Sequence, residues 1–351
     1  MAVELVVPYW REGNEKGFAD FITSSQDAKK IALISHTDLD GLTSAKVISA
    51  VLPPDYIRFV GYNEINLELV KELVAQKVTH VVFSDLLIEN PEVTKELEKS
   101  ARILIIDHHV LKYKLGSAKT TFLNAEGFCA AYLSYYLFSK VQDISKLDWL
   151  VACACLGDWC WRSPGQWLEG VFRKYDERFV ADNKEVKKGK FWEVVEVISK
   201  GLIFYYADLK KAYSLIGNSF DELQGLEKAS LAVQAEIDRC KNDFEKKKVP
   251  IKDGWFYEAK SEYPVKSYII NEVSLDRYPN KTILLGSDRS EGGYYSISAR
   301  RQDSKFNLAE YLAKTVEGLD GASGGGHPKA AGALFLPKDK AEVFRRLGVK
   351  S

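Results

Sequence analysis

The sequence predicts an α/β protein of two domains: an N-terminal domain with a mostly parallel sheet flanked by helices, and a smaller α/β C-terminal domain with a mixed sheet. Between residues 31 and 124, short runs of β-branched residues alternate with helical segments. A charged helical segment then leads to a region after Pro250 that is rich in strands. With 351 residues, 46% of them hydrophobic, the chain is long enough to bury two cores.

The N-terminal strands read as continuous apolar runs, which is typical of a parallel sheet that helices cover on both faces. The predicted strands are residues 31–35, 57–61, 79–85, 103–107 and 120–124. Helical segments at 42–52 and 66–77 lie between them, and Asn66 is expected to cap the second. Two strongly apolar helices follow at 127–140 and 146–159.

The C-terminal region begins after a charged helical connector. We place the first domain at 1–225, with a helical insert at about 165–225, the linker at 226–250 with its boundary near residue 245, and the second domain at 251–351. In the second domain the predicted strands are 254–260, 265–271, 281–286 and 292–300. A helix is expected at 306–318, and residues 321–335 are expected to form a glycine loop that enters a strand.

The overall charge is balanced, with 49 Lys and Arg residues against 49 Asp and Glu residues. Any binding of nucleic acid must therefore depend on a local patch rather than on a global positive field. The chain has no apolar stretch near the roughly 20 residues that a membrane-spanning helix needs, and its N-terminus lacks the pattern of a signal peptide. We therefore expect a cytoplasmic protein without membrane contact.

The five cysteines contain no CxxC pair and lie mostly in apolar helical context. This pattern favours small buried side chains in a reducing compartment. A zinc site built from Cys153, Cys155 and Cys160 is the alternative, but their surroundings resemble the inside of a buried helix.

Histidines and carboxylates follow the ends of several predicted strands and of the second apolar helix. These residues are His36, Asp38, Asp40, Asp85, Asp107, His108, His109 and Asp158. In open parallel sheets, ligands bind at the carboxyl ends of the strands. Carboxylates that gather there repel one another and lose solvation, so the arrangement is costly unless cations neutralise it.

We therefore predict a site for two divalent cations at this edge of the sheet. His36, Asp38 and Asp40 alternate along the chain and would face one side of an extended segment. They could then serve two ions that lie about 3.5–4 Å apart. Imidazole and carboxylate ligands without thiolate favour Mn²⁺, with Mg²⁺, Co²⁺ or iron as less favoured alternatives.

The motifs in this order resemble those of the DHH phosphoesterase superfamily, in the branch of RecJ-like and nano-RNase-like exonucleases of archaeal type. The N-terminal resemblance consists of HTDLDG at 36–41, Asp85, DHH at 107–109 and Asp158. Further along, GGGHPKAAG at 324–332, preceded by SISAR at 296–300, resembles the DHH-associated C-terminal domain. DLLIEN after the second motif departs from the family pattern, and residues 165–245 match nothing in it.

The resemblance implies a role for each motif residue. One metal would be held by His36, Asp38 and Asp85, and the second by Asp40, Asp85, His108 and Asp158, so that Asp85 bridges the two. Asp107 would orient the histidines, and His109 would contact the phosphate. In the C-terminal domain, substrate phosphate would be bound by Arg300, Gly324, Gly325, Gly326, His327 and Lys329.

The expected function is a Mn²⁺-dependent phosphodiesterase that degrades single-stranded RNA, single-stranded DNA or short oligonucleotides from an end by two-metal in-line attack. Two alternatives use the same fold. One is a phosphatase or phosphodiesterase for a small molecule, such as a bisphosphonucleoside or a cyclic dinucleotide, and the other is a non-catalytic replication or repair scaffold. A helicase or a replication or repair protein is a candidate partner, and the chain is expected to be a monomer or a homodimer.

Overall fold

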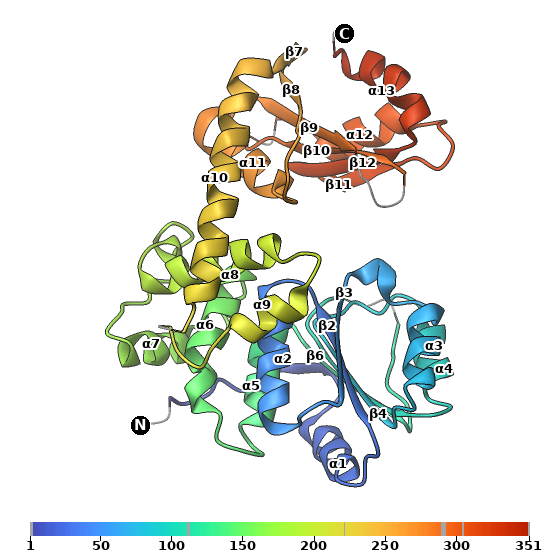
Figure 1. Ribbon diagram of the computed structural model, residues 1–351, viewed down its shortest axis with the longest axis vertical. Helices are drawn as coiled ribbons and strands as arrows, with labels where there is room; N and C mark the ends of the chain where they lie inside the picture. The colour runs from blue at the N-terminus through green and yellow to red at the C-terminus, as the bar shows by residue number, and fades with distance from the viewer. Residues whose placement is uncertain (1–2, 111–112, 221, 289–292, 304, 350–351) are drawn as a thin grey trace. The chain divides into compact units, whose positions relative to one another are not determined.

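A computed structural model describes residues 3–110, 113–220, 222–288, 293–303 and 305–349 of the chain (Figure 1). The chain divides into two compact units between Ser230 and Leu231, inside a long helix. Each unit contains a six-stranded sheet with helices packed on it. The α/β class that the sequence predicts is therefore confirmed for both units.

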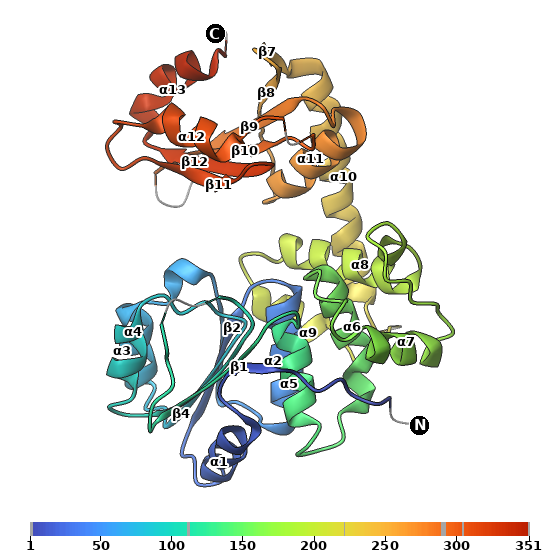
Figure 2. The ribbon, with the colours of Figure 1, turned by 180° about the vertical axis from the view of Figure 1, so that it is seen from behind.

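The sheet of the first unit is parallel except at one edge. Its strands are β1 (Trp10–Glu12), β2 (Ile31–His36), β3 (Tyr56–Val60), β4 (His80–Ser84), β5 (Arg102–Asp107) and β6 (Thr120–Ala125). Their order is β1-β6-β5-β4-β2-β3, and β1 pairs antiparallel with β6 at the edge (Figure 2). The other neighbouring strands pair in parallel, as expected from their continuous apolar runs.

Helices cover both faces of this sheet. They are α1 (Glu15–Ser25), α2 (Leu39–Val51), α3 (Leu67–Ala75), α4 (Pro91–Leu97), α5 (Ala130–Phe138), α6 (Asp148–Gly157), α7 (Gly165–Lys174), α8 (Lys190–Phe204) and α9 (Leu209–Leu215). Short 3₁₀ turns lie at η1 (Tyr62–Glu64), η2 (Ser145–Leu147) and η3 (Glu185–Lys187). Helix α3 begins at the predicted cap, because the Asn66 side chain accepts hydrogen bonds from the Glu68 and Leu69 amides.

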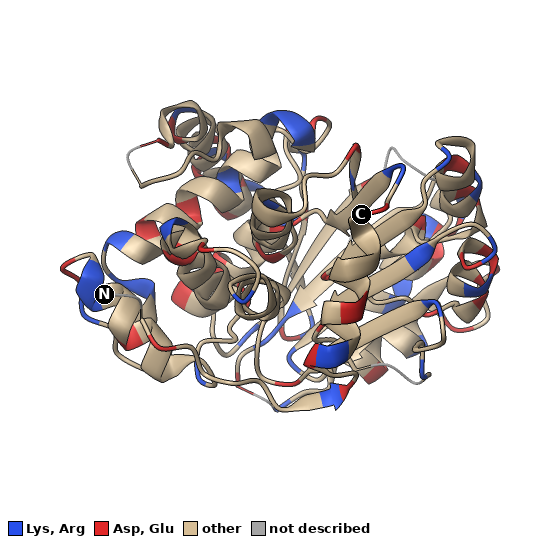
Figure 3. Cartoon of the chain, turned by 90° about the horizontal axis from the view of Figure 1, so that it is seen from below, with Lys and Arg blue, Asp and Glu red and all other residues tan. Residues whose placement is uncertain are grey.

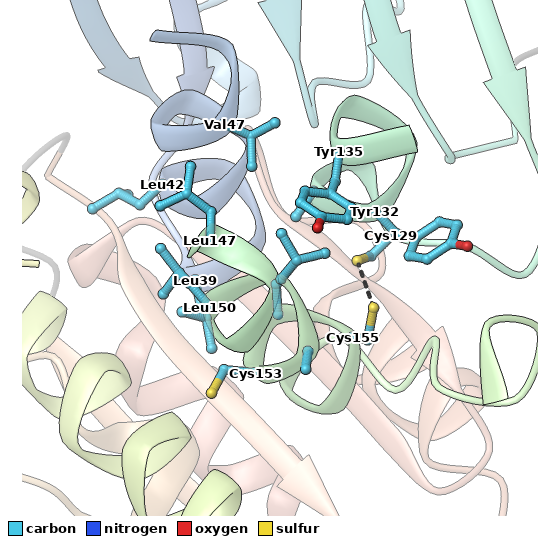
Figure 4. Close-up of a cluster of buried hydrophobic side chains, with 14 of the residues drawn as sticks. Leu39, Leu42, Val47, Cys129, Tyr132, Tyr135, Leu147, Leu150, Cys153 and Cys155 are labelled. Carbon is cyan, nitrogen blue, oxygen red and sulfur yellow. Dashed lines mark hydrogen bonds between the residues drawn. The ribbon is translucent and has the colours of Figure 1, made fainter. Parts of the chain in front are cut away.

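Two apolar cores lie on opposite faces of the first sheet. Side chains alternate along each strand, so Leu33 of β2 enters one core and Ile34 enters the other. The larger core packs α2, α5 and α6 together, with residues such as Leu42 and Leu150 between them (Figure 4). Helices α3 and α4 cover the opposite face (Figure 1). This packing holds α2 and α6 against the sheet.

The cysteines of this core do not form a common metal site. Cys155 Sγ lies 3.7 Å from Cys129 Sγ (Figure 4), whereas Cys153 Sγ faces the carbonyl oxygen of Phe191. Cys160 Sγ instead donates to Asp158 at 3.0 Å. The zinc alternative built from Cys153, Cys155 and Cys160 has no geometric support, because the three thiols face different neighbours.

The second unit begins within α10 (Gln224–Lys247), the helix that the sequence predicts for the connector. Its strands are β7 (Val249–Ile251), β8 (Gly254–Glu258), β9 (Thr282–Asp288), β10 (Tyr295–Arg300), β11 (Ser323–His327) and β12 (Ala330–Phe335). Its helical elements are α11 (Lys266–Glu272), the π-helical η4 (Val273–Arg277), α12 (Leu308–Val316), η5 (Pro337–Asp339) and α13 (Lys340–Leu347). The strand order is β11-β12-β10-β9-β8-β7, and only the β8–β9 pair is parallel among the described strands. The predicted mixed sheet is confirmed.

Two predicted elements of the second unit are wrong. Residues 265–271 form helix α11 instead of a strand. The buried residues of α11 are Ile269 and Ile270, and Val265 before the helix and Val273 after it are also buried, a spacing of helical period that their strand propensity obscured. The glycine-rich run is not a loop either, since Ser323–His327 forms edge strand β11 and pairs with β12.

Lysine, arginine, aspartate and glutamate side chains are interspersed along the chain (Figure 3), as the balanced composition suggests. Within the described residues, no helix combines the length and the apolar character that crossing a bilayer demands.

Candidate metal centre

The carboxyl edge of the first sheet brings the motif residues into one row. Ser35 of β2 is paired with Ser84 of β4, and Ser84 is paired with Ile106 of β5. The next residues along the three strands are His36, Asp85 and Asp107. Because parallel strands end at the same edge, this register alone sets an imidazole and two carboxylates side by side.

A first group of ligand atoms surrounds the His36 ring. Its Nδ1 lies 3.0 Å from Asp38 Oδ2 and 3.5 Å from Asp85 Oδ2. Asp38 is held in place because it caps α2, where its Oδ1 accepts a hydrogen bond from the Gly41 amide at 3.0 Å. Asp38 Oδ1 therefore caps α2, and Asp38 Oδ2 faces His36.

A second group surrounds His108, whose Nε2 lies 3.4 Å from Asp85 Oδ1 and 3.6 Å from Asp158 Oδ2. Asp158 is brought here by the end of α6, of which it is the C-terminal cap residue. The carboxylate of Asp85 thus presents Oδ2 to the first group and Oδ1 to the second. Among the described residues, Asp85 is the side chain with one oxygen near each histidine.

Asp40 faces the site from a helix, whereas we predicted an extended segment. The chain is not extended from 36 to 40, because Asp40 lies in the first turn of α2. Its carboxylate accepts hydrogen bonds from the Ala130 and Ala131 amides at 2.8 and 2.7 Å, at the N-terminus of α5. Asp40 Oδ2 still lies 3.9 Å from His108 Nε2, so it faces the second group from a more distant position.

Asp107 and His109 form a separate chain of polar contacts with Tyr62. His109 Nδ1 lies 2.8 Å from the buried Asp107 Oδ1, and His109 Nε2 lies 3.2 Å from the hydroxyl of Tyr62. The Tyr62 ring also stacks on the His36 ring at a centroid distance of 4.5 Å. Asp107 therefore orients His109, and we find no comparable contact from Asp107 to His108 among the described residues.

Burial and crowding shift the protonation of the acidic residues. Burial raises the pKa of Asp85, Asp40 and Asp158 above the usual range, and repulsion from neighbouring carboxylates adds to the shift. Burial would lower the pKa of His36, but the carboxylates of Asp38 and Asp85 outweigh it and raise that pKa to about 10. The protein atoms alone thus hold negative charge at a considerable electrostatic cost.

Several buried polar atoms at this edge lie close to an imidazole or carboxylate but form no well-aligned hydrogen bond with it. They include His36 Nδ1, Asp85 Oδ2 and His108 Nε2. Buried polar atoms without partners are rare in folded proteins because each one costs free energy. Divalent cations would satisfy these atoms and offset the carboxylate repulsion, so the donor set fits metal binding.

The backbone at Asp85 is also unusual. Its φ is +58°, in the left-handed region that non-glycine residues seldom adopt. Its amide donates to the Ile106 carbonyl at 3.0 Å, which fixes this conformation. Strained residues of this kind cluster at functional sites, where the surrounding structure holds them in place.

The C-terminal candidates lie in the second unit, at one end of the β10–β12–β11 strands. Arg300, the last residue of β10, pairs in register with Ala330 of β12, which in turn pairs with His327 of β11. The side chains of His327 and Lys329 are exposed. This end of the sheet therefore gathers a guanidinium, an imidazole and an ammonium group.

Arg300 and Arg301 have different surroundings. Arg300 Nε donates to the side-chain carbonyl of Asn271 at 2.9 Å, and no described carboxylate oxygen lies within 4.0 Å of its guanidinium. Burial lowers the pKa of Arg300. Arg301 is instead engaged by Asp303 and Asp253, so Arg300 is the one available to an anion.

The three glycines of β11 differ in what they contact. A Cβ atom at Gly324 would lie 2.7 Å from the Leu312 carbonyl oxygen of α12, and at Gly326 it would lie 2.6 Å from the Ala330 carbonyl oxygen. At Gly325 it would meet nothing within 4 Å. The fold thus requires Gly324 and Gly326 to lack a side chain, whereas Gly325 has open space beside it.

Two family models match the chain. Residues 30–157 match the N-terminal domain of the DHH family, and residues 267–347 match the DHHA1 domain. The chain belongs to the DHH family. We refer to its first unit as the DHH unit and to its second as the DHHA1 unit, and residues 158–266 lie outside both matches. No curated protein matches the sequence.

Solved structures share the fold at low sequence identity. The DHH domain of a member of the s1p family of ribosomal proteins is 19% identical, with a TM-score of 0.67 over 96% of this chain and 90% of that one. Exonuclease RecJ bound to manganese is 15% identical, with a TM-score of 0.65 over 99% and 95%. A pGpG-specific phosphodiesterase from Vibrio cholerae is 16% identical, with a TM-score of 0.51 over 90% and 99%.

Sequence reasoning missed several contacts of the DHH unit. Tyr62 follows β3, and Asn124 is the penultimate residue of β6 and donates to the His109 carbonyl oxygen at 2.9 Å. Examining the end of every strand would have found both. Arg11, which donates to the His108 carbonyl oxygen at 3.2 Å, gave no such signal because β1 is short and lies at the sheet edge.

Proposed function

We propose that this DHH-family protein is a metal-dependent phosphodiesterase that hydrolyses single-stranded nucleic acid or short oligonucleotides from an end. The observation that carries the proposal is the position of Asp85, which faces His36 with one oxygen and His108 with the other. A carboxylate shared in this way is what a pair of divalent cations requires.

His36, Asp38 and Asp85 would hold one cation, and Asp85, His108, Asp158 and Asp40 would hold the other, with Mn²⁺ preferred. When bound, two such cations activate water for attack and stabilise the charge that develops on the phosphoryl oxygens. The protein's own contribution is to fix these ligands before substrate arrives. Strand register, the cap of α2 and the end of α6 do so without further ordering.

His109 is proposed to donate a hydrogen bond to a non-bridging phosphate oxygen. Asp107 fixes the orientation of its ring, and the carboxylate raises the pKa of His109 even though burial opposes the shift. Because Nδ1 faces Asp107, Nε2 can donate to a phosphate oxygen only when both ring nitrogens carry a proton, and the raised pKa favours this form. Tyr62 lies within hydrogen-bond distance of His109 Nε2 and would have to share it with the substrate.

The DHHA1 unit is proposed to bind the substrate phosphate and sugar. Arg300 has no carboxylate partner among the described residues, and His327 and Lys329 are exposed nearby in the register of the sheet. The open space at Gly325 lets a ligand approach the backbone closely. These groups would recognise an anion without base specificity.

A time course with end-labelled RNA and DNA oligomers and Mn²⁺ tests this function. We expect a ladder of products that shortens from one end, and its pattern reports polarity and sugar preference. EDTA should abolish it. Intact oligomers after prolonged incubation with Mn²⁺, Mg²⁺ and Co²⁺ would contradict the proposal.

A second candidate substrate is a linear dinucleotide. Its support is the shared fold with a pGpG-specific phosphodiesterase, although at 16% identity this likeness extends to the fold alone. Competition between a five-nucleotide RNA and pGpG separates the two. Hydrolysis of pGpG with the longer RNA left intact would favour the dinucleotide.

A further inference from the structure

An exposed tryptophan directly follows the metal-site residue Asp158. The Trp159 side chain is 47% exposed, while Trp161, two residues later, is buried in the core. Large aromatic side chains are usually buried, and an exposed one is informative when it borders a site. Trp159 therefore offers part of its ring to a ligand beside the metal centre.

The end of helix α6 fixes the position of Trp159. Its φ is +58°, and the described residues include only four non-glycine residues with positive φ. Two of these four, Asp85 and Trp159, border the metal centre. This conformation closes the C-terminus of α6, because the Trp159 amide donates to the Leu156 carbonyl oxygen at 3.2 Å and the Cys160 amide to the Cys155 carbonyl oxygen at 3.0 Å, so the position of Trp159 beside Asp158 is fixed by the helix end.

Two further residues complete a surface beside Trp159. The Trp192 ring of α8 lies 6.2 Å from the Trp159 ring, and Lys187 Nζ lies 5.0 Å from the Trp159 ring centroid and 5.7 Å from that of Trp192. Trp192 is partly buried against the core, so it anchors the surface that Trp159 exposes. We call Trp159, Trp192 and Lys187 the tryptophan platform.

The charge of the platform is available to a ligand. No described carboxylate oxygen lies within 4.0 Å of Lys187 Nζ, whereas the neighbouring Lys188 is paired with Glu185 at 2.6 Å. Lys187 is exposed and carries its charge on a flexible stem. An aromatic surface with an unpaired cation matches a base and its phosphate.

We propose that the tryptophan platform binds a base of the single-stranded substrate, next to the phosphodiester at the metal centre. A base would stack on the exposed face of Trp159 in place of Lys187 Nζ, which would then pair with a backbone phosphate. The inference rests on the proposed function and extends it to the region outside both family matches. It gives part of the unassigned insert a role in substrate binding.

Oligomers with a single abasic position test the platform. The rate constant kcat/KM is measured for five-nucleotide DNA oligomers with the abasic site at each position in turn. For the natural protein, one position should lower kcat/KM roughly 5- to 100-fold, since stacking on an aromatic side chain contributes about that much per base. The variant Trp159→Asn should lose the same factor with the intact oligomer and lose nothing further with that abasic one.

The controls separate stacking from a structural effect. Asn accepts the left-handed backbone at residue 159, so the variant keeps the local fold, and metal analysis should find the natural metal content. Tyr206→Asn removes another exposed aromatic ring of the same unit and should behave as the natural protein does. Lys187→Ala should reduce the salt dependence of binding by about 0.7 in log–log slope, and Lys188→Ala should change it less.

Two results would overturn the inference. If the oligomers are hydrolysed but Trp159→Asn shows equal losses with intact and abasic oligomers, or none, the platform has no base site and the proposed function stands. If the natural protein neither hydrolyses nor, by fluorescence anisotropy, binds any oligomer, both proposals fail together.

Discussion

The candidate sites of the DHH unit and the DHHA1 unit consist of side chains of opposite charge. The DHH unit gathers buried carboxylates and imidazoles, whose orphaned atoms fit cations. The DHHA1 unit gathers exposed or unpaired cationic side chains beside a glycine strand with open space, which fit an anion. The formal neutrality of the whole chain therefore conceals two regions of opposite character, and net charge is a poor guide to what such a protein binds.

The largest expected effect comes from removing the residue shared by both groups. Asp85→Ala should lose both bound metals, because one oxygen of Asp85 faces each group, and hydrolysis should fall by at least about 10³-fold. Metal analysis and oligomer hydrolysis measure the two effects, with the exposed Asp20→Ala as the matched control. Two ions retained by Asp85→Ala would refute the shared role.

Removing His109 should affect chemistry without affecting metal content. His109 contacts Asp107 and Tyr62, so His109→Ala should lower kcat roughly 10²- to 10³-fold while the bound metal stays. The neighbouring His108→Ala should lose metal as well. If His109→Ala also lost metal, the division of roles between the two histidines would be wrong.

Metal affinity should rise with pH in the DHH unit. The raised pKa of Asp40, Asp85 and Asp158, and the pKa of about 10 at His36, mean that protons compete with cations. We expect about a tenfold gain in affinity per pH unit for each proton displaced. Titrating the protein with Mn²⁺ between pH 5 and 8 measures this gain.

The same shifts fix how stability depends on pH. Acid groups with a raised folded pKa destabilise the metal-free protein as pH rises above their unfolded values near 4, and His36 loses its stabilising contribution above its unfolded value of about 6.5. The increase in Tm on adding Mn²⁺ should therefore be larger at pH 8 than at pH 5. A Tm increase that is independent of pH would contradict the cost assigned to the cluster.

Two glycines of β11 test whether the DHHA1 unit uses its glycine strand for binding or for folding. Gly325→Ala should leave Tm unchanged and raise KM for oligomers about tenfold, because its Cβ would occupy only open space. Gly324→Ala should destabilise the DHHA1 unit by about 1–3 kcal/mol, because its Cβ would meet the backbone of α12. Equal loss of Tm in both variants would show that Gly325 also serves the fold.

The smallest effect is expected at Tyr62. Tyr62→Phe keeps the ring stacked on His36 and removes the hydroxyl near His109, so kcat should change by up to about tenfold. Tyr62→Ala should have a larger effect, because it also releases the His36 ring. If the two variants were indistinguishable, the ring would contribute nothing to the position of His36.

The sequence by itself determined the elements and the edge of the sheet where the motif residues lie. Continuous apolar strands require helices on both faces, and the motif residues lie at or near the ends of strands and helices, so their placement is local information. The same reasoning failed at 265–271 and at β11, where β-branched residues and glycines favour more than one structure. In both cases packing against the rest of the unit decided the outcome.

Only the tertiary structure decided how the ligand atoms are shared. Strand register sets His36, Asp85 and Asp107 in a row, and the turn into α2 sends Asp40 to the N-terminus of α5, which an extended segment would not do. The contacts of Tyr62 and the exposure of Trp159 likewise depend on elements far apart in the chain. Sequence spacing fixes the direction of a side chain along one element, whereas distances between elements are set by how their cores pack.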